Sequence, residues 1–187
     1  MGDDRMNEEK GVESFTLIYT SSSPEETQEL GQTLGEILQA GDVICLFGDL
    51  GAGKTCFAQG VAWGAGFPLH DYISSPTFTL IHEYSGKWPI YHLDFYRIKK
   101  PEELLDLGYE EYFFGQGIVI VEWADRVDGF LPPERLEVWL RRMNMMQREI
   151  TITAIGDRYI DLMEKLVEEV SPEGEEKEQE EDIPYRA

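Results

Sequence analysis

The amino-acid sequence predicts a single α/β domain with a mixed, largely parallel sheet flanked by helices. Its 187 residues are enough for one domain with a proper core and too few for two. Two short, continuously apolar runs, at residues 43–47 and 118–121, are typical of strands buried in a parallel sheet. Around them, apolar residues recur at helical spacing. Together these features favour the α/β class.

The first half of the domain is expected to contain two strands and two helices. Residues 15–19 predict the first strand. A helix follows, with Ser23 as its N-cap, a proline at its first position and Glu26 closing a capping box. Residues 43–47 form the second strand, and residues 55–65 form the helix after a glycine-rich loop.

The second half is expected to add strands and to end in a helix. Apolar patterns predict strands at residues 78–84, 89–93, 118–121, 136–140 and 149–154. The first two flank a Ser-Gly-Lys turn and predict a hairpin. A short helix opens at Pro101, and a last amphipathic helix places Ile160, Met163 and Leu166 on one face.

Composition and charge limit the partners and the location of the protein. No apolar run approaches the ~20 residues of a membrane span, and the N-terminus does not resemble a signal peptide, so a cytoplasmic protein without membrane contact is expected. The net charge of −21, with 16 basic against 37 acidic residues, disfavours strong direct binding to nucleic acid. We expect a flexible N-terminus (residues 1–12), the domain proper (13–170) and an acidic, disordered tail (171–187).

The cysteines and histidines do not form a metal-binding pattern. Cys45 and Cys56 give neither a disulfide framework nor a metal-ligand spacing, and Cys45 is interpreted as a small buried hydrophobe. His70, His82 and His92 are not spaced as a metal site. His82 and His92 lie on strand-like runs and are interpreted as structural.

The glycine-rich loop carries the strongest chemical signal. Residues 48–55 (GDLGAGKT) match G-x-x-x-x-G-K-[ST], the P-loop, and stand between a strand-like and a helix-like run. Glycines allow backbone amides to surround phosphate oxygens, and the following helix presents its positive end to the same anion. Lys54 is expected to contact the β- and γ-phosphates and Thr55 to bind Mg²⁺. The sequence therefore predicts a P-loop NTPase-like domain.

A P-loop also needs an acidic residue at the end of a second strand. Glu122 and Asp94 both follow strand-like runs, and the residues alone do not choose between them or exclude solvated strand-end carboxylates. Thr77 belongs to a hydroxyl-rich loop suited either to sensing a γ-phosphate or to plain turn chemistry. Trp123 either lines a ligand pocket or simply packs.

These motifs, in this order, resemble the TsaE (YjeE) family, small bacterial ATPases of tRNA threonylcarbamoyladenosine biosynthesis. The resemblance spans roughly residues 14–154 and rests on residues 48–55, 75–80 (SPTFTL), 93–97 (LDFYR), 102–104 (EEL) with Gly108-Tyr109, and 121–123 (VEW). It implies a weak ATPase that uses ATP and Mg²⁺, as a monomer or weak oligomer. It also implies docking on the TsaB–TsaD complex, which transfers the threonylcarbamoyl group to adenosine 37 of tRNAs reading ANN codons.

The resemblance also assigns roles to individual residues. It makes Glu122 the Mg²⁺-linked carboxylate and Asp94 a carboxylate needed for activity. It places Thr77 in a switch-like loop and Trp123 beside the nucleotide, and sets Ser23 and Arg148 near its base or sugar. The nucleotide-binding residues implied are Ser23, Gly48, Gly51, Ala52, Gly53, Lys54, Thr55, Cys56, Thr77, Trp123 and Arg148, with Lys54, Asp94 and Glu122 catalytic. Cys56 departs from the family, which commonly has a second threonine there.

Two alternatives remain open at the level of sequence. A P-loop small-molecule kinase needs arginines on a closing lid, and no insertion of that length is present among the residues that follow the loop. A nucleotide-dependent binding module would use ATP as a conformational ligand, with incidental hydrolysis. A GTPase is disfavoured because the sequence has no N-K-x-D motif.

Overall fold

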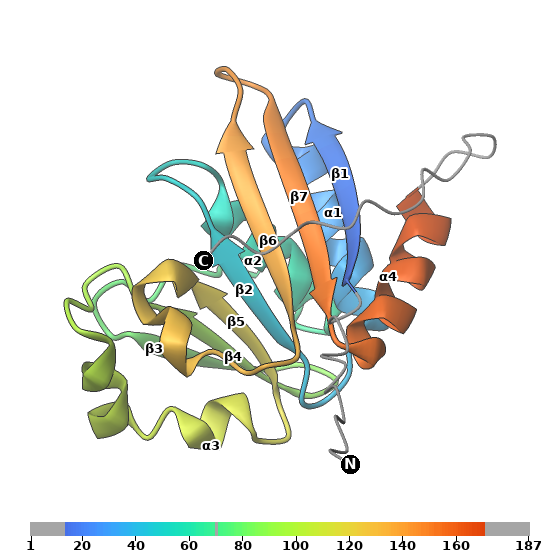
Figure 1. Ribbon diagram of the computed structural model, residues 1–187. Helices are drawn as coiled ribbons and strands as arrows, with labels where there is room; N and C mark the ends of the chain where they lie inside the picture. Colours follow the sequence, from blue (N-terminus) through green and yellow to red (C-terminus); the bar gives the residue numbers. More distant parts are fainter. Residues whose placement is uncertain (1–13, 70, 171–187) are drawn as a thin grey trace, which may run out of the picture.

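The computed structural model describes residues 14–69 and 71–170, which form a seven-stranded sheet in the order β1-β7-β6-β2-β5-β4-β3 (Figure 1). The strands are β1 (Ser14–Ser21), β2 (Val43–Phe47), β3 (Ile81–Ser85), β4 (Pro89–Asp94), β5 (Ile118–Glu122), β6 (Arg135–Arg142) and β7 (Arg148–Ile155). The helices are α1 (Pro24–Ile37), α2 (Lys54–Gly64), α3 (Glu110–Phe113) and α4 (Asp157–Val170), with 3-10 helices η1 (Pro101–Leu107) and η2 (Ala124–Phe130). The flexible N-terminus and acidic tail expected from the sequence lie outside the described residues.

The sheet is mixed, as the sequence predicts. Its centre is parallel, because β2 pairs in parallel with β5 and β6, and β5 with β4. Its edges are antiparallel, through β1–β7, β6–β7 and β3–β4. β2 and β5 are buried along their whole length, which explains their continuously apolar sequences. The parallel core brings the carboxyl ends of β2, β4 and β5 to one edge.

Alternate residues of the central strands pack into two hydrophobic cores. Ile44 and Leu46 face α1, α2 and α4. Val43 and Cys45 face the opposite side, where residues from η1, α3 and η2 cover the sheet. Figure 1 shows these two layers on either side of the sheet. No helix in the described part of the chain is long and apolar enough to span a membrane.

Helices α1 and α2 approach each other closely because glycines line both surfaces. A Cβ atom added at Gly31 would lie 2.5 Å from the carbonyl oxygen of Phe57, and one at Gly35 would lie 2.2 Å from that of Val61. On α2, a Cβ at Gly60 would lie 2.1 Å from the carbonyl oxygen of Gln28. These contacts are with backbone, which a rotamer change cannot relieve. The close packing fixes α2, and therefore the loop at its start, against α1.

Gly60→Ala is expected to lower the free energy of unfolding by about 1–3 kcal/mol, despite the ~1 kcal/mol that alanine gains in helix propensity. The added methyl group would force α1 and α2 apart. Urea unfolding followed by circular dichroism measures the change. The matched control is Gly129→Ala, since a Cβ at Gly129 meets no atom within 4 Å. Equal stability of the two variants would contradict the packing argument.

The structure differs from the predicted elements at the start of β3, at the N-terminus of α1 and in two short helices. The strand expected at 78–84 begins only at Ile81, because residues 77–80 form a turn in which Leu80 has φ +67° and donates to the Pro76 carbonyl at 2.7 Å. The carboxylate of Glu26 accepts from the amide of Ser22 rather than from the N-cap Ser23. The short helices η2 and α3 were not predicted, since neither is long enough to show helical periodicity.

Candidate functional site

The glycine-rich loop connects β2 to α2 and has the backbone that its sequence predicts. Gly48, Gly51 and Gly53 have φ values of +132°, +77° and +114°, in the region that favours glycine. A Cβ at Gly48 would also lie 2.3 Å from the carbonyl oxygen of Leu140 on β6. Gly53 is the N-cap of α2 and has no side chain to cap the first amides. The loop and helix start are thus built to surround an anion.

Lys54 is held over this loop in a fixed position. Its side chain is buried, and Nζ donates to the carbonyl oxygens of Gly48 at 2.6 Å and Asp49 at 3.0 Å. The same nitrogen lies 3.6 Å from the centroid of the Trp123 ring, a cation–π contact. Burial lowers the pKa of Lys54, although the charge of Glu122 acts in the opposite direction. The ammonium group is therefore positioned before any ligand arrives.

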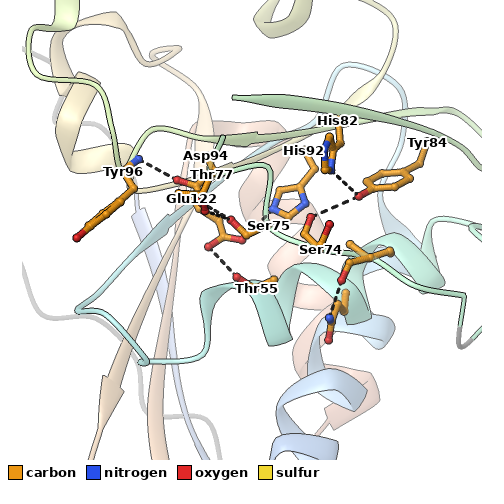
Figure 2. Close-up of polar contacts among 12 residues, drawn as sticks. Thr55, Ser74, Ser75, Thr77, His82, Tyr84, His92, Asp94, Tyr96 and Glu122 are labelled. Atoms are coloured by element: carbon orange, nitrogen blue, oxygen red, sulfur yellow. Dashed lines mark hydrogen bonds and ion pairs between the residues drawn. The ribbon is translucent and has the colours of Figure 1, made fainter. Parts of the chain in front are cut away.

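Glu122 and Asp94 end adjacent parallel strands and face each other in register. Both are buried, with 2% and 1% of their surface exposed, so neither is a solvated strand-end carboxylate. Thr55 Oγ1 donates to Glu122 Oε2 at 3.0 Å, which links the first turn of α2 to the end of β5. Figure 2 shows both carboxylates near Thr55. The residue pattern alone does not choose between the two acids, the family resemblance assigns the metal to Glu122, and the fold brings both acids to the loop.

The oxygen donors at this position suit Mg²⁺. Among the described residues, no three His, Cys, Asp or Glu side chains are grouped to hold a metal ion by themselves. Mg²⁺ needs no such group, because it is usually bound through one or two carboxylates together with substrate phosphates and water. The Thr55 hydroxyl and the Glu122 carboxylate are hard oxygen ligands beside the phosphate loop. They fit a metal ion that arrives with a nucleotide.

Asp94 is tied to the hydroxyl-rich loop. Its Oδ2 accepts hydrogen bonds from Ser75 Oγ and from Thr77 Oγ1, the latter at 2.7 Å. Its Oδ1 accepts from the amide of Tyr96 at 2.8 Å. Thr77, which the family resemblance places in a switch-like loop, is thus connected to the carboxylate itself (Figure 2). Ser75 and Tyr96 also contact it; both lie in the quoted motifs but were not among the predicted site residues.

Trp123 has a backbone that few non-glycine residues adopt. Its φ is +59°, in the left-handed region, directly after the end of β5. Its ring lies against Lys54 on one side, and 4.9 Å from the Tyr96 ring, centroid to centroid. Left-handed residues of this kind concentrate at functional sites. Of the two sequence interpretations, the structure favours an aromatic wall of the pocket.

Ser23, Cys56 and Arg148 lie beside the loop rather than in it. The hydroxyl of Ser23 accepts from the Glu26 amide at 3.1 Å, which occupies it as an N-cap. The Cys56 thiol donates to the Pro24 carbonyl at 3.3 Å, and burial raises its pKa to about 11, so it is not a reactive thiolate. Arg148 contacts the Met146 carbonyl at 2.8 Å. Contact of Ser23 and Arg148 with a base or sugar, and the nucleotide-binding role of Cys56, remain predictions.

A cavity of about 330 Å³ opens where these groups meet. Its lining consists of Leu50, Gly51, Gly53, Lys54, Thr55, Cys56, Ser75, Thr77, Asp94, Tyr96, Glu122 and Trp123. Ser23, Gly48, Ala52 and Arg148 are not among the lining residues. A larger hollow of about 530 Å³ follows the β3–β4 hairpin and contains neither the loop nor the buried carboxylates. We therefore place the site at the smaller cavity.

His92, which the sequence analysis interprets as structural, contacts one of the two buried carboxylates. Its Nε2 lies 2.9 Å from Glu122 Oε1, and the side chain is buried. The sequence does indicate that His92 lies near Asp94. The two residues are two positions apart on β4, so their side chains share a face of the sheet. Only the pairing of β4 with β5 reveals its partner.

Sequence comparisons with known proteins point to one family. The model of the family described as "Threonylcarbamoyl adenosine biosynthesis protein TsaE" matches residues 21–150. A Bacillus subtilis protein named tRNA threonylcarbamoyladenosine biosynthesis protein TsaE is 46% identical over 151 residues, which cover 80% of this chain and 93% of that protein. A Nostoc protein of the same name is 42% identical over 157 residues, covering 81% and 94% of the two chains.

A solved structure has the same fold as this chain. The crystal structure of Bacillus subtilis YdiB superposes with a TM-score of 0.72 and 40% sequence identity, covering 86% of this chain and all of that one. The matched residues 21–150 include the phosphate loop, both buried carboxylates and Trp123. On the extent and identity of these matches, the chain belongs to the TsaE family.

Proposed function

We propose that this protein is an ATP-binding and ATP-hydrolysing accessory factor for the threonylcarbamoylation of adenosine 37 in tRNAs that read ANN codons. It acts in the cytoplasm with the TsaB–TsaD pair. The relatives are named for tRNA threonylcarbamoyladenosine biosynthesis, which supports the pathway. The observation that carries the biochemical part is the convergence of Lys54, Thr55, Glu122 and Asp94 on one cavity.

Different residues of the chain have different roles in binding and hydrolysis. The amides of the loop and the start of α2 bind the phosphates, and Lys54 neutralises their charge from its preset position. Thr55 and Glu122 would hold the metal ion that accompanies the nucleotide. When bound, Mg²⁺ would neutralise the charge that develops on the phosphates during transfer. Asp94, held by Ser75 and Thr77, positions the attacking water or couples the site to a partner.

Hydrolysis by the isolated protein should be slow. No arginine of the described residues lines the cavity. Arg97 instead lies over the exposed ring of Phe78, at 5.2 Å from its centroid. An arginine supplied to a transition state is worth about 10³–10⁵ in turnover. A partner that contributed such a group would accelerate the reaction greatly.

The same feature supports a second candidate, a binding module for which ATP is only a conformational ligand. A lining without arginine suits slow or incidental hydrolysis. It gives no support to a small-molecule kinase, which requires arginines that close over the phosphates. Phosphate released to water, with none transferred to metabolites, would exclude the kinase.

Reconstitution tests the proposed pathway. Purified TsaB–TsaD, supplied with tRNA and the threonylcarbamoyl donor, should complete about one round without this protein and many rounds with it and ATP. Product nucleoside measured by mass spectrometry counts the rounds. Unchanged product yield would contradict the proposed function. A Lys54→Ala protein that still supports many rounds would favour the binding module.

A further inference from the structure

The carboxylate of Glu122 is held from two sides. Its Oε2 accepts from Thr55 Oγ1 at 3.0 Å, and its Oε1 lies 2.9 Å from His92 Nε2 (Figure 2). The two contacts come from different elements, α2 and β4, while Glu122 ends β5. Thr55 can itself bind a metal ion through the same hydroxyl group. His92 is therefore the contact that fixes Glu122 independently of the metal.

The chemistry of the pair sets the direction of this hydrogen bond. A carboxylate only accepts hydrogen bonds, so Nε2 of His92 is the protonated ring nitrogen and donates a hydrogen bond to Oε1. Nδ1 has no hydrogen-bond partner within the described structure and is buried. The imidazole thus has a single polar contact, and that contact is with Glu122. No other polar group of the described residues fixes the ring's orientation, so its one directional interaction serves the carboxylate.

A purely structural role accounts poorly for this arrangement. His92 and Glu122 are 1% and 2% exposed. Replacing a buried polar or ionic pair by apolar residues of similar volume is often neutral or stabilising, because removing both groups from water is costly. The core needs only an apolar residue at position 92, as at the neighbouring Ile90 and Leu93. The histidine is explained by the carboxylate that it orients.

We propose that His92 is a positioning residue that orients the Glu122 carboxylate for the metal ion of the bound nucleotide. The inference rests on the proposed function, since it needs a metal–nucleotide complex at this site. Partners that orient metal ligands typically change metal affinity by about 10–100-fold when they are removed. His92 has no contact with the phosphate loop among the hydrogen bonds of the described residues, so metal-free nucleotide binding should not depend on it.

The test is a titration of the full chain with Mn²⁺, an oxygen-seeking substitute for Mg²⁺, at saturating ADP, followed by electron paramagnetic resonance. His92→Leu removes the donor and retains an apolar side chain that suits the core. It should weaken Mn²⁺ binding by about 10-fold or more. His92→Gln places an N–H donor at a distance from the backbone similar to that of the histidine Nε2, so Mn²⁺ affinity should stay within about 3-fold. His82→Gln is the matched control, because His82 is the cross-strand neighbour of His92 and has no contact with Glu122.

The outcomes separate this inference from the proposed function. If the unchanged protein forms no Mn²⁺–ADP complex, the proposed function fails. If it does, and His92→Leu binds Mn²⁺ equally well, only the role of His92 is refuted. Since a packing role would favour leucine over glutamine, Mn²⁺ binding that is stronger in His92→Leu than in His92→Gln also contradicts the proposal. So does a His92→Leu protein that loses metal-free ADP affinity.

Discussion

Lys54→Ala is expected to lower ATP turnover by about 100-fold or more, because it removes a preorganised donor from the developing phosphate charge. The ammonium group is fixed by two loop carbonyls and the Trp123 ring, so binding requires little reorganisation. Nothing else in the cavity lining carries a positive charge. Release of inorganic phosphate under saturating Mg·ATP measures the effect.

The control for this prediction is Lys87→Ala, which removes an exposed lysine at the β3–β4 turn. It should leave turnover unchanged. Lys54 is buried, so circular dichroism must first show that the alanine variant is folded. A folded Lys54→Ala protein with the turnover of Lys87→Ala would refute the assignment of Lys54 to the phosphates.

Glu122→Gln should abolish the dependence of hydrolysis on Mg²⁺ and reduce turnover by about 100-fold or more. Glutamine preserves the size of the side chain and can still accept from Thr55, but it lacks the charge that holds a divalent ion. Metal-free nucleotide binding should persist, since the loop amides and Lys54 remain. Turnover measured across a range of Mg²⁺ concentrations separates the two effects.

Glu164→Gln, an exposed substitution on α4, is the matched control for loss of one negative charge. Its turnover should follow the same Mg²⁺ curve as the unchanged protein. Retention of that curve by Glu122→Gln would show that the metal is held elsewhere. Asp94 would then become the leading candidate, because it is the adjacent buried carboxylate.

The sequence predicts those parts of the site that depend on local geometry. The loop at residues 48–55 requires glycines at positions of positive φ, followed by the start of a helix. Both features can be recognised from consecutive residues of the sequence. The end of β5 was also predictable, because a buried parallel strand is a short apolar run, and the end of β4 followed from the hairpin pattern. The mixed sheet and its flanking helices followed from the same patterns.

The parts that could not be predicted depend on contacts between distant segments. The contacts of Ser75 with Asp94 and of His92 with Glu122 form only when the loop reaches Asp94 and when β4 pairs with β5. The turn at residues 77–80 has strand-like composition, and tertiary contacts rather than propensity decide its conformation. Ser23 is a different case. Its hydroxyl group, which the sequence analysis places near the nucleotide, already accepts a hydrogen bond as the N-cap of α1.

The most direct test of the whole account is calorimetric titration of the purified protein with ATP, with and without Mg²⁺. We predict saturable binding that Mg²⁺ strengthens, because the loop, Lys54, Thr55 and Glu122 converge on one cavity. GTP should not reproduce it, because the sequence has no N-K-x-D motif to recognise guanine. Absence of Mg²⁺-dependent binding of adenine nucleotides, both alone and in the presence of TsaB–TsaD, would contradict it.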